Sequence, residues 1–329
     1  MRVVIDKGIP FLEGVFDPIA EAVFLSPEEI NAHTVRDADA LFVRTRTQIN
    51  KELLHGSNVQ FVATATIGFD HINQDYCREN GIYWTSCPGC NAQAVCDYVE
   101  EAIASSPHRL IASSPITIGI VGYGNVGKLV AQMAENHGYR VLLSDPPLGI
   151  GSSLKEIAPQ CDVLTFHPPL TRDGEHPTYH LCDAEILRLC KPNALIINAA
   201  RGGVVDEQAL LASGRDYVLD TWEGEPHINL EVLRHARLAS MHIAGYSVQG
   251  KANATAMCVR AIASFFGFPL CSWYPPQITP TTPQLISWDE LRTILPTRYD
   301  IAAESDTLKQ NYSNFETLRN NYNYREEWF

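Results

Sequence analysis

Residues 116–127 read ITIGIVGYGNVG, a β-branched apolar run followed by a glycine-rich turn, and a helix-like stretch (128–135) comes next. In this order, Gly122 allows a tight turn from strand to helix, and Gly124 has no Cβ to keep a pyrophosphate away. Gly127 lets the helix pack closely on the strand, while the N–H groups at the helix N-terminus attract phosphate. The segment therefore predicts a dinucleotide-binding turn.

A second strand ending in an acidic residue completes this signature. Residues 139–143 have the composition of a short strand, and Asp145 follows, 18 residues after Gly127. A carboxylate at this position accepts hydrogen bonds from a ribose 2′-hydroxyl and repels a 2′-phosphate, which indicates NAD rather than NADP. A glycine-rich turn without a ligand is the simpler alternative, but it does not require an acid at this spacing. We therefore predict NAD as the cofactor.

The composition narrows the class of protein. The chain has 329 residues, enough for two domains and a small third one. Its net charge of −13 argues against nucleic acid and anionic membranes as partners, because proteins that bind them cluster Lys and Arg. No apolar stretch approaches the ~18 residues of a membrane span, and the N-terminus does not resemble a signal peptide. Nine scattered cysteines fit reduced thiols, so we expect a cytoplasmic protein.

Short apolar runs alternate with helical patterns, which predicts an α/β protein with parallel sheets covered by helices. The strand-like runs of the first part are Val3–Ile5, Ala40–Val43, Phe61–Thr64 and Ile82–Trp84. Those of the second part, as many as a doubly wound Rossmann fold requires, are Ile116–Val121, Arg140–Leu143, Val163–Phe166, Ala194–Asn198, Tyr217–Leu219 and Arg237–Ser240. Helical patterns cover Asn91–Ser105, Asp183–Leu189, Glu207–Leu211 and Ser247–Phe266.

Three polar residues follow strands of the second series and are candidates for catalysis. Arg201 follows the run 195–200, Glu225 lies in the segment DTWEGEP, and His242 follows the run 238–241. Ligands of a doubly wound sheet bind outside the carboxyl ends of its strands. We therefore expect all three side chains to face the crevice that holds the nicotinamide.

The three groups have complementary chemistry. The imidazole of His242 takes or gives a proton near neutral pH, a role typically worth ~10²–10⁴ in rate. A carboxylate such as Glu225, bonded to the other ring nitrogen, fixes the tautomer and favours the imidazolium. The guanidinium of Arg201 grips a carboxylate or polarises a carbonyl. Each residue alone is more simply explained as structural, but the three together behind a dinucleotide turn indicate hydride transfer.

Several segments resemble those of a known enzyme family. NAARGGVVDEQAL (198–210), VLDTWEGEP (218–226) and HIAGY (242–246) are similar to signatures of the D-isomer-specific 2-hydroxyacid dehydrogenases. VIDKGIP, DADALFVRTRT, FVATATIGFDHI and HIAGYSVQGKA most resemble the branch that oxidises 4-phospho-D-erythronate in vitamin B6 synthesis. The resemblance covers residues 1–266 densely. The alternatives are a relative acting on phosphoglycerate, glycerate or lactate, and a non-catalytic NAD(H)-sensing regulator on the same fold.

This resemblance implies a role for each matching residue. Arg201 and Glu225 would form the active-site pair, with His242 as proton donor and acceptor. Cofactor contacts would come from Gly122, Gly124, Asn125, Val126, Gly127, Asp145, Ala200, Arg201, Gly202, Asp220 and Gly245. Substrate contacts would come from Thr45, Thr66, Tyr246 and the main-chain N–H groups around Ile67 and Gly68, which form an anion-binding nest.

The resemblance also implies the domain organisation. Residues 1–92 and 247–268 would form a flavodoxin-like substrate-binding domain, split in sequence around an NAD-binding Rossmann domain at 93–246. Residues 269–329 would be a linker and a small, shortened dimerisation region, so a homodimer is expected. Hinge closure between the two main domains would exclude water from the substrate.

The substrate phosphate requires cations, and an acidic chain must supply them locally. We expect Arg44 and Arg46, which flank Thr45, to bind the phosphate, with Lys251 as a further candidate. The alternative is that these cations are solvated or paired with Asp37 or Asp39.

Two further features bear on the site. Pro168 stands where the family has Thr and removes a hydroxyl and an N–H from the cofactor side. Cys87 and Cys90 have CxxC spacing, but without a second pair or clustered His residues they indicate a structural turn, and no metal is expected.

Overall fold

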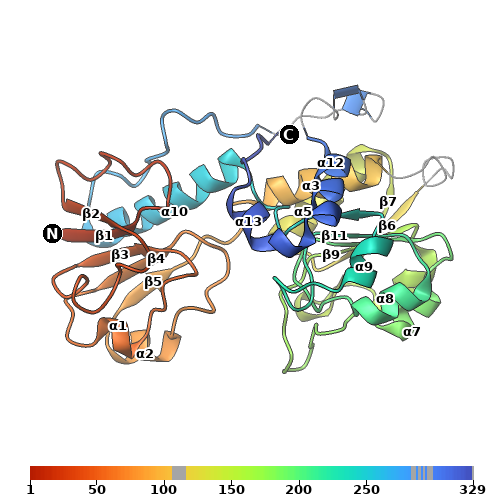
Figure 1. The fold of residues 1–329 in the computed structure, drawn as a ribbon, viewed down its shortest axis with the longest axis horizontal. Coiled ribbons are helices and arrows are strands. Elements are labelled where there is room, and N and C mark those ends of the chain that lie inside the picture. Colours follow the sequence, from red (N-terminus) through yellow and green to blue (C-terminus); the bar gives the residue numbers. More distant parts are fainter. Residues whose placement is uncertain (106–115, 283–286, 288–289, 292, 295–298, 328–329) are drawn as a thin grey trace. The chain divides into compact units, whose positions relative to one another are not determined.

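The computed structural model of the protein describes residues 1–105, 116–282, 287, 290–291, 293–294 and 299–327. The chain divides into two compact units, and each is described by itself. Residues 1–91 and 247–281 form unit 1, and residues 92–246 and 282–329 form unit 2. Figure 1 shows a parallel sheet with helices packed on it in each unit. The described residues after 282 thus group with unit 2, whereas the sequence indicated a separate C-terminal region.

Unit 1 contains a five-stranded parallel sheet of order β2-β1-β3-β4-β5, the flavodoxin-like arrangement. Its strands are β1 (Arg2–Asp6), β2 (Glu21–Leu25), β3 (Ala40–Val43), β4 (Phe61–Thr64) and β5 (Tyr83–Thr85). Its helices are α1 (Lys51–Leu54), α2 (Gln74–Glu79) and α10 (Val248–Phe266). The edge strand β2 was not among the predicted strands; it contains the short apolar run Ala22–Leu25, but all its residues are partly or fully exposed.

The core of unit 1 explains why α10 belongs to it although the helix is remote in sequence. Buried side chains of α10, such as Val259 and Ile262, share one hydrophobic cluster with Val3 and Ile5 of β1, and the helix contacts β4 of the same sheet (Figure 1). Val4 points to the opposite face and packs with a second cluster. This alternation follows from the two-residue period of a strand.

Unit 2 contains a seven-stranded sheet of order β12-β11-β10-β9-β6-β7-β8, parallel except for the antiparallel β8. Its strands are β6 (Thr117–Val121), β7 (Arg140–Asp145), β8 (Ile150–Gly151), β9 (Val163–Phe166), β10 (Leu195–Asn198), β11 (Tyr217–Leu219) and β12 (Leu238–Ala239). The strand order reverses between β6 and its neighbours β7 and β9, so the topological switch point lies at the glycine-rich turn. The doubly wound prediction is confirmed. Among the described strands of unit 2, only the two-residue β8 was not predicted from the sequence.

Helices and short 3-10 turns cover both faces of this sheet. The α-helices are α3 (Ala92–Ala104), α5 (Asn125–Asn136), α6 (Leu154–Ile157), α7 (Ala184–Leu189), α8 (Glu207–Ser213), α9 (Leu230–His235), α12 (Ile301–Gln310) and α13 (Phe315–Asn320). The 3-10 turns are η1 (Pro146–Leu148), η2 (Ala158–Gln160) and η3 (Tyr312–Asn314).

The C-terminal helices α12 and α13 are part of this core. Leu308 and Phe315 are buried in the cluster on one face of the sheet, and Ile301 is buried in the cluster on the other. The hydroxyl of Ser305 in α12 accepts a hydrogen bond from Ala239 N in β12 at 3.0 Å. Within the described part of the chain, no helix has the length and apolar character needed to cross a membrane.

Candidate active site

The glycine-rich turn has the geometry that a bound pyrophosphate requires. Gly122 has a φ of +88°, and a Cβ on it would lie 2.8 Å from Pro168 N, so only glycine fits. A Cβ on Gly127 would lie 2.0 Å from the Gly122 carbonyl oxygen. A Cβ on Gly124 would meet nothing within 4 Å, and no side chain caps the helix that begins after it at Asn125. The N-terminus of α5 is therefore an open anion site.

Asp145, the predicted ribose ligand, ends β7 beside this turn. Its carboxylate accepts a hydrogen bond from Tyr123 N at 2.6 Å and another from Leu148 N at 3.2 Å. The side chain is therefore fixed, at 9% exposure, between the glycine-rich turn and the 3-10 turn after β7. An ionised carboxylate has further lone pairs, so a ribose hydroxyl can still bind.

The three catalytic candidates follow neighbouring strands, because β10, β11 and β12 lie side by side in the sheet. Arg201 follows β10 in a turn organised by Asn198, whose side chain accepts from Ala200 N at 3.1 Å and donates to Arg201 O at 3.0 Å. A Cβ on Gly202 would lie 1.9 Å from Trp222 O, so this turn packs directly against the segment after β11. The guanidinium of the exposed Arg201 donates to the carbonyl of Ala200.

His242 and Glu225 form a hydrogen-bonded pair. The His242 Nδ1 and Glu225 Oε2 atoms lie 2.9 Å apart. Because an ionised carboxylate can only accept, Nδ1 carries the hydrogen, and Nε2 of the neutral ring is left as a base. The other oxygen, Oε1, accepts from Trp222 N at 2.9 Å, which fixes the carboxylate. His242 adopts a φ of +60°, a left-handed conformation uncommon outside glycine that is seen at functional sites.

The charge of Glu225 is supported by its surroundings. Burial raises the pKa of this carboxyl, but the hydrogen bond and charge of His242, the Trp222 N–H and the Arg319 guanidinium outweigh burial, so that the pKa is lowered overall. Glu225 therefore stays ionised at neutral pH, as an anchor for an imidazolium must.

Asp220 organises the loop that carries His242. Its carboxylate is 1% exposed and accepts from Ser240 Oγ at 2.7 Å, Ile243 N at 2.7 Å and Ala244 N at 3.0 Å. Its own carbonyl accepts from His242 N at 2.8 Å. The resemblance implied a contact with NAD, which stays a prediction; the structure shows the side chain holding the backbone on both sides of His242.

The predicted substrate residues of unit 1 lie after β3 and β4. Arg44 donates from Nε and Nη2 to the two carboxylate oxygens of Asp6, at 2.8 and 2.9 Å. Its ion-pair partner is thus the fully buried Asp6, and neither Asp37 nor Asp39. Thr45 and Arg46 are exposed.

The second predicted substrate segment, Thr66 to Gly68, is half-buried. Thr66 Oγ1 donates to Gly68 O at 2.9 Å and shares a hydrogen bond of 2.8 Å with Thr64 Oγ1. Thr64 is bonded in turn to His71 Nε2 at 3.0 Å, so a short polar chain shapes this turn.

Comparisons with known proteins agree with this geometry. Residues 97–254 match the family model described as “D-isomer specific 2-hydroxyacid dehydrogenase, NAD binding domain”. Erythronate-4-phosphate dehydrogenase of Bacteroides thetaiotaomicron is 42% identical, over 99% of this chain and 97% of that protein. The enzyme of that name from Cronobacter sakazakii is 38% identical, over 100% of this chain and 92% of that one.

The chain belongs to the D-isomer specific 2-hydroxyacid dehydrogenase family.

The fold of this dehydrogenase agrees as well. The NAD⁺-bound 3-phosphoglycerate dehydrogenase of Entamoeba histolytica superposes with a TM-score of 0.67 at 22% identity, over 85% of this chain and 99% of that one. NAD is the cofactor of this dehydrogenase. The open N-terminus of α5 and the fixed carboxylate of Asp145 fit its pyrophosphate and ribose. When bound, NAD supplies the hydride acceptor.

Pro168 lies at the switch point of this dehydrogenase. It is buried after β9, and its nitrogen lies so close to Gly122 that a Cβ there would be 2.8 Å away. A proline nitrogen carries no hydrogen, so this position offers the cofactor neither a main-chain donor nor a hydroxyl.

Two arginines of the C-terminal segment contact this site, and the sequence analysis missed both. Arg319 in α13 approaches Glu225 and Tyr246, and Arg325 donates to main-chain carbonyls of the loop after His242. Nothing local marks them, because each meets residues more than seventy positions away.

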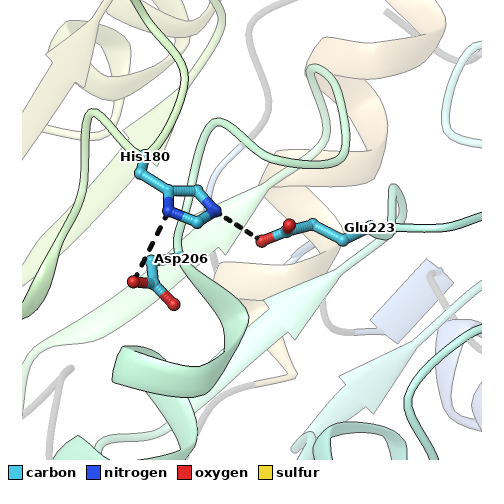
Figure 2. A group of neighbouring side chains, drawn as sticks. All are labelled: His180, Asp206 and Glu223. Carbon is cyan, nitrogen blue, oxygen red and sulfur yellow. Dashed lines mark hydrogen bonds and ion pairs between the residues drawn. The ribbon is translucent and has the colours of Figure 1, made fainter.

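A group of titratable side chains lies beside the Arg201 turn. His180 bridges two carboxylates, with Nε2 at 2.9 Å from Glu223 Oε1 and Nδ1 at 3.6 Å from Asp206 Oδ2 (Figure 2). These ligand atoms are close enough together to surround a metal ion. However, each carboxylate already has the histidine as its partner, which accounts for the arrangement without an ion. That no metal is needed stays a prediction.

Proposed function

We propose that this dehydrogenase oxidises 4-phospho-D-erythronate to 2-oxo-3-hydroxy-4-phosphobutanoate with NAD, in the synthesis of pyridoxal phosphate. The observation that carries the proposal is the His242–Glu225 pair, 2.9 Å apart, at the sheet edge that also bears the dinucleotide turn. The choice of substrate is supported by the full-length similarity to proteins named erythronate-4-phosphate dehydrogenase.

In this reaction the chain moves one proton and positions the substrate. Nε2 of His242 takes the proton of the C2 hydroxyl, and bound NAD would supply the acceptor for the hydride of C2. The resulting imidazolium is stabilised by Glu225, which already accepts the Nδ1 hydrogen. Arg201 polarises the developing carbonyl or grips the carboxylate, for which its exposed guanidinium has donors to spare.

The remaining contacts divide between the ends of the substrate. The main-chain N–H groups around Ile67 and Gly68 of unit 1 would hold the carboxylate. The hydroxyls of Thr45 and Thr66 in unit 1 and of Tyr246 in unit 2 would be further substrate contacts. The phosphate would be bound by cations of unit 1. Arg44 spends two donors on Asp6 but keeps others, and the exposed Arg46 and half-buried Lys251 are further candidates.

We further propose a cytoplasmic homodimer, as the resemblance implies. None of the nine cysteines, all of which lie in the described part of the chain, forms a disulfide, and eight are buried, which fits a reducing compartment.

The decisive test is NADH formation by the purified protein with 4-phospho-D-erythronate, D-3-phosphoglycerate and D-lactate at equal concentrations. A strong preference for the first acid supports the proposal. A preference for another acid keeps the mechanism and replaces the substrate. No turnover with any of them, together with measurable NAD binding, would favour a regulator that senses NAD(H).

A further inference from the structure

The C-terminal helix α13 places a second guanidinium at the reaction centre. Phe315 at the start of the helix is 2% exposed and packs in the core of unit 2, which fixes the helix. Arg319, one turn later, is partly buried and extends toward the pair formed by His242 and Glu225. It was not among the residues that the sequence indicated.

The contacts of Arg319 join two groups of the proposed mechanism. Its Nε donates to the Tyr246 hydroxyl at 3.2 Å. Its Nη1 lies 3.9 Å from Glu225 Oε2, the same oxygen that accepts the Nδ1 hydrogen of His242. The guanidinium also lies 5.9 Å from the centre of the Tyr246 ring. A single side chain thus touches both the predicted substrate hydroxyl and the carboxylate that orients the base.

The buried side chain of Arg325, which we call the clamp, joins the segment that bears Arg319 to the loop after His242. Arg325 is 7% exposed and donates to the carbonyls of Ile243 at 2.9 Å and Tyr246 at 3.3 Å, as well as to that of Ala244. It also donates to Ala94 O in α3 at 2.9 Å. The clamp therefore fixes the loop and the C-terminal segment to one helix of the core.

Aromatic rings close the arrangement around Tyr246. The rings of Tyr322 and Tyr324 meet the Tyr246 ring edge-on, with centroids 6.2 and 5.8 Å away. The orientation of the Tyr246 hydroxyl thus depends on the C-terminal segment for both its packing and its hydrogen bond.

We propose that Arg319 is a positioning residue of the reaction centre, which acts through the Tyr246 hydroxyl and the Glu225 carboxylate. The proposal rests on the proposed function, because it assigns Arg319 a part in the same proton transfer. The physical reason is that the charge of Arg319 does not change during the reaction. His242 is neutral before it takes the substrate proton and positive afterwards, whereas a guanidinium stays charged throughout. Arg319 therefore gives Glu225 a cationic neighbour even while the imidazole is neutral.

The other titratable groups near Glu225 make this cation more important. Glu207 of α8 and Glu223, two residues before Glu225, are both acids. The pKa of Glu207 is raised to about 7, chiefly by burial; the Glu223 N–H lowers it, and the charges of Glu223, Glu225 and Asp206 contribute to the rise. Arg319 and His242 supply the positive charge that favours the ionised form of Glu225. The neighbouring acids carry negative charge and disfavour that form.

The test compares Arg319→Gln and Arg319→Lys with Arg234→Gln, a substitution of an exposed arginine of α9 that forms an ion pair with Glu231 one turn away. Without Arg319, the coupled Glu225–His242 pair becomes more basic, so the acid limb of kcat/KM should move to higher pH by about half a unit to one unit. At pH 7, kcat/KM should fall about tenfold. Arg319→Lys keeps the positive charge but loses the hydrogen bond to Tyr246, so the acid limb of kcat/KM should lie close to its wild-type pH. Arg234→Gln should behave as wild type.

A merely structural role predicts a different pattern. It would lower kcat/KM equally at every pH together with the melting temperature, and that result would overturn the proposal. The pairing with Tyr246 is tested by a double-mutant cycle: Tyr246→Phe and Arg319→Gln should be non-additive in kcat/KM. Additive losses would remove Tyr246 from the proposal.

A readout without turnover separates this inference from the proposed function. In the NAD-free protein, the ¹³C shift of the Glu225 carboxyl carbon reports its titration whichever acid is the substrate. Arg319→Gln should raise the pKa of this carboxyl, because it removes one of the groups that lower it. An unchanged titration would overturn the role of Arg319 even in an active enzyme. A raised pKa in a protein that oxidises none of the acids would reject only the proposed function.

Discussion

The two sheets of this dehydrogenase each carry a carboxylate near their carboxyl edge, fully buried Asp6 in unit 1 and half-buried Glu225 in unit 2, but the partners of the two carboxylates differ. In unit 1, Asp6 at the end of β1 is held by two hydrogen bonds from Arg44. In unit 2, Glu225 is held by His242 and approached by Arg319. A guanidinium keeps its charge at any physiological pH, whereas an imidazole exchanges a proton. Similar pairings can therefore serve structure in one unit and chemistry in the other.

The largest effect on activity should come from replacing His242, the titratable partner of Glu225 in unit 2. His242→Asn removes the proton acceptor, so kcat should fall ~10²-fold or more while NAD affinity barely changes. Steady-state kinetics and cofactor titration measure the two quantities. His235→Asn, at the exposed end of α9, is the matched control. A loss below tenfold would move the proton transfer to another group.

Breaking the Asp6–Arg44 pair of unit 1 should change the stability of the fold. Arg44→Gln leaves the fully buried Asp6 without its cation, which should lower the free energy of unfolding by about 3 kcal/mol. Arg46→Gln, at the exposed neighbouring position, should change it by less than ~0.5 kcal/mol. Urea denaturation measures both. If Arg44→Gln instead raised KM for a phosphorylated substrate and left stability unchanged, Arg44 would be a phosphate ligand and the contrast between the units would fail.

A third carboxylate, that of Glu101, is buried and has fewer favourable partners than Asp6 or Glu225. Glu101 of α3 is 3% exposed, and burial raises its pKa to about 8, with Asp300 and Glu100 adding to the effect and the Ile301 N–H and Arg325 opposing it. Between the unfolded pKa of ~4.3 and about 8, the folded state keeps a proton that the unfolded state has lost. This contribution to the free energy of unfolding is therefore full at low pH and is lost as pH rises through that window.

Glu101→Gln removes this dependence because the amide does not titrate. Relative to wild type, the variant should gain roughly 3.5 kcal/mol in the free energy of unfolding between pH 5 and pH 8. Urea denaturation at both pH values measures the gain, with the exposed Glu135→Gln in α5 as control. A difference that does not change with pH would mean that Glu101 is ionised in the folded protein.

The smallest effect concerns the cofactor edge of unit 2. Gly124→Ala adds a methyl group with no neighbour within 4 Å, so the melting temperature should barely change while Kd for NAD rises about tenfold. Gly127→Ala should instead destabilise the fold, because its Cβ would lie 2.0 Å from Gly122 O. Calorimetric titration and thermal unfolding separate the two. Unaltered NAD binding by Gly124→Ala would place the pyrophosphate elsewhere.

Local sequence signals account for what could be predicted. The central strands were found because apolar runs stand between turn residues, and the dinucleotide turn because glycine has a physical task at fixed spacing. Arg201, Glu225 and His242 were found because each follows a strand of one sheet. Their roles stay predictions.

The interactions that hold these side chains could not be predicted. Asp6 and Arg44 are 38 residues apart, and Arg325 and Ile243 are 82 apart. Such pairs depend on how distant strands and helices come together, and no local spacing reveals them. The same reason hid the contribution of α13 to the site.

The clamp made by Arg325 has a consequence for how the enzyme is synthesised. The ribosome translates this residue after every strand of both sheets and after His242 and Glu225. A nascent chain that has not yet reached position 325 lacks the guanidinium that donates to the carbonyls of Ile243, Ala244 and Tyr246. Domains that fold during translation do so from the N-terminus onward, so the nucleotide fold can form before its reaction centre is complete. Activity should therefore appear late in synthesis, and prematurely terminated chains should bind cofactor without turning it over.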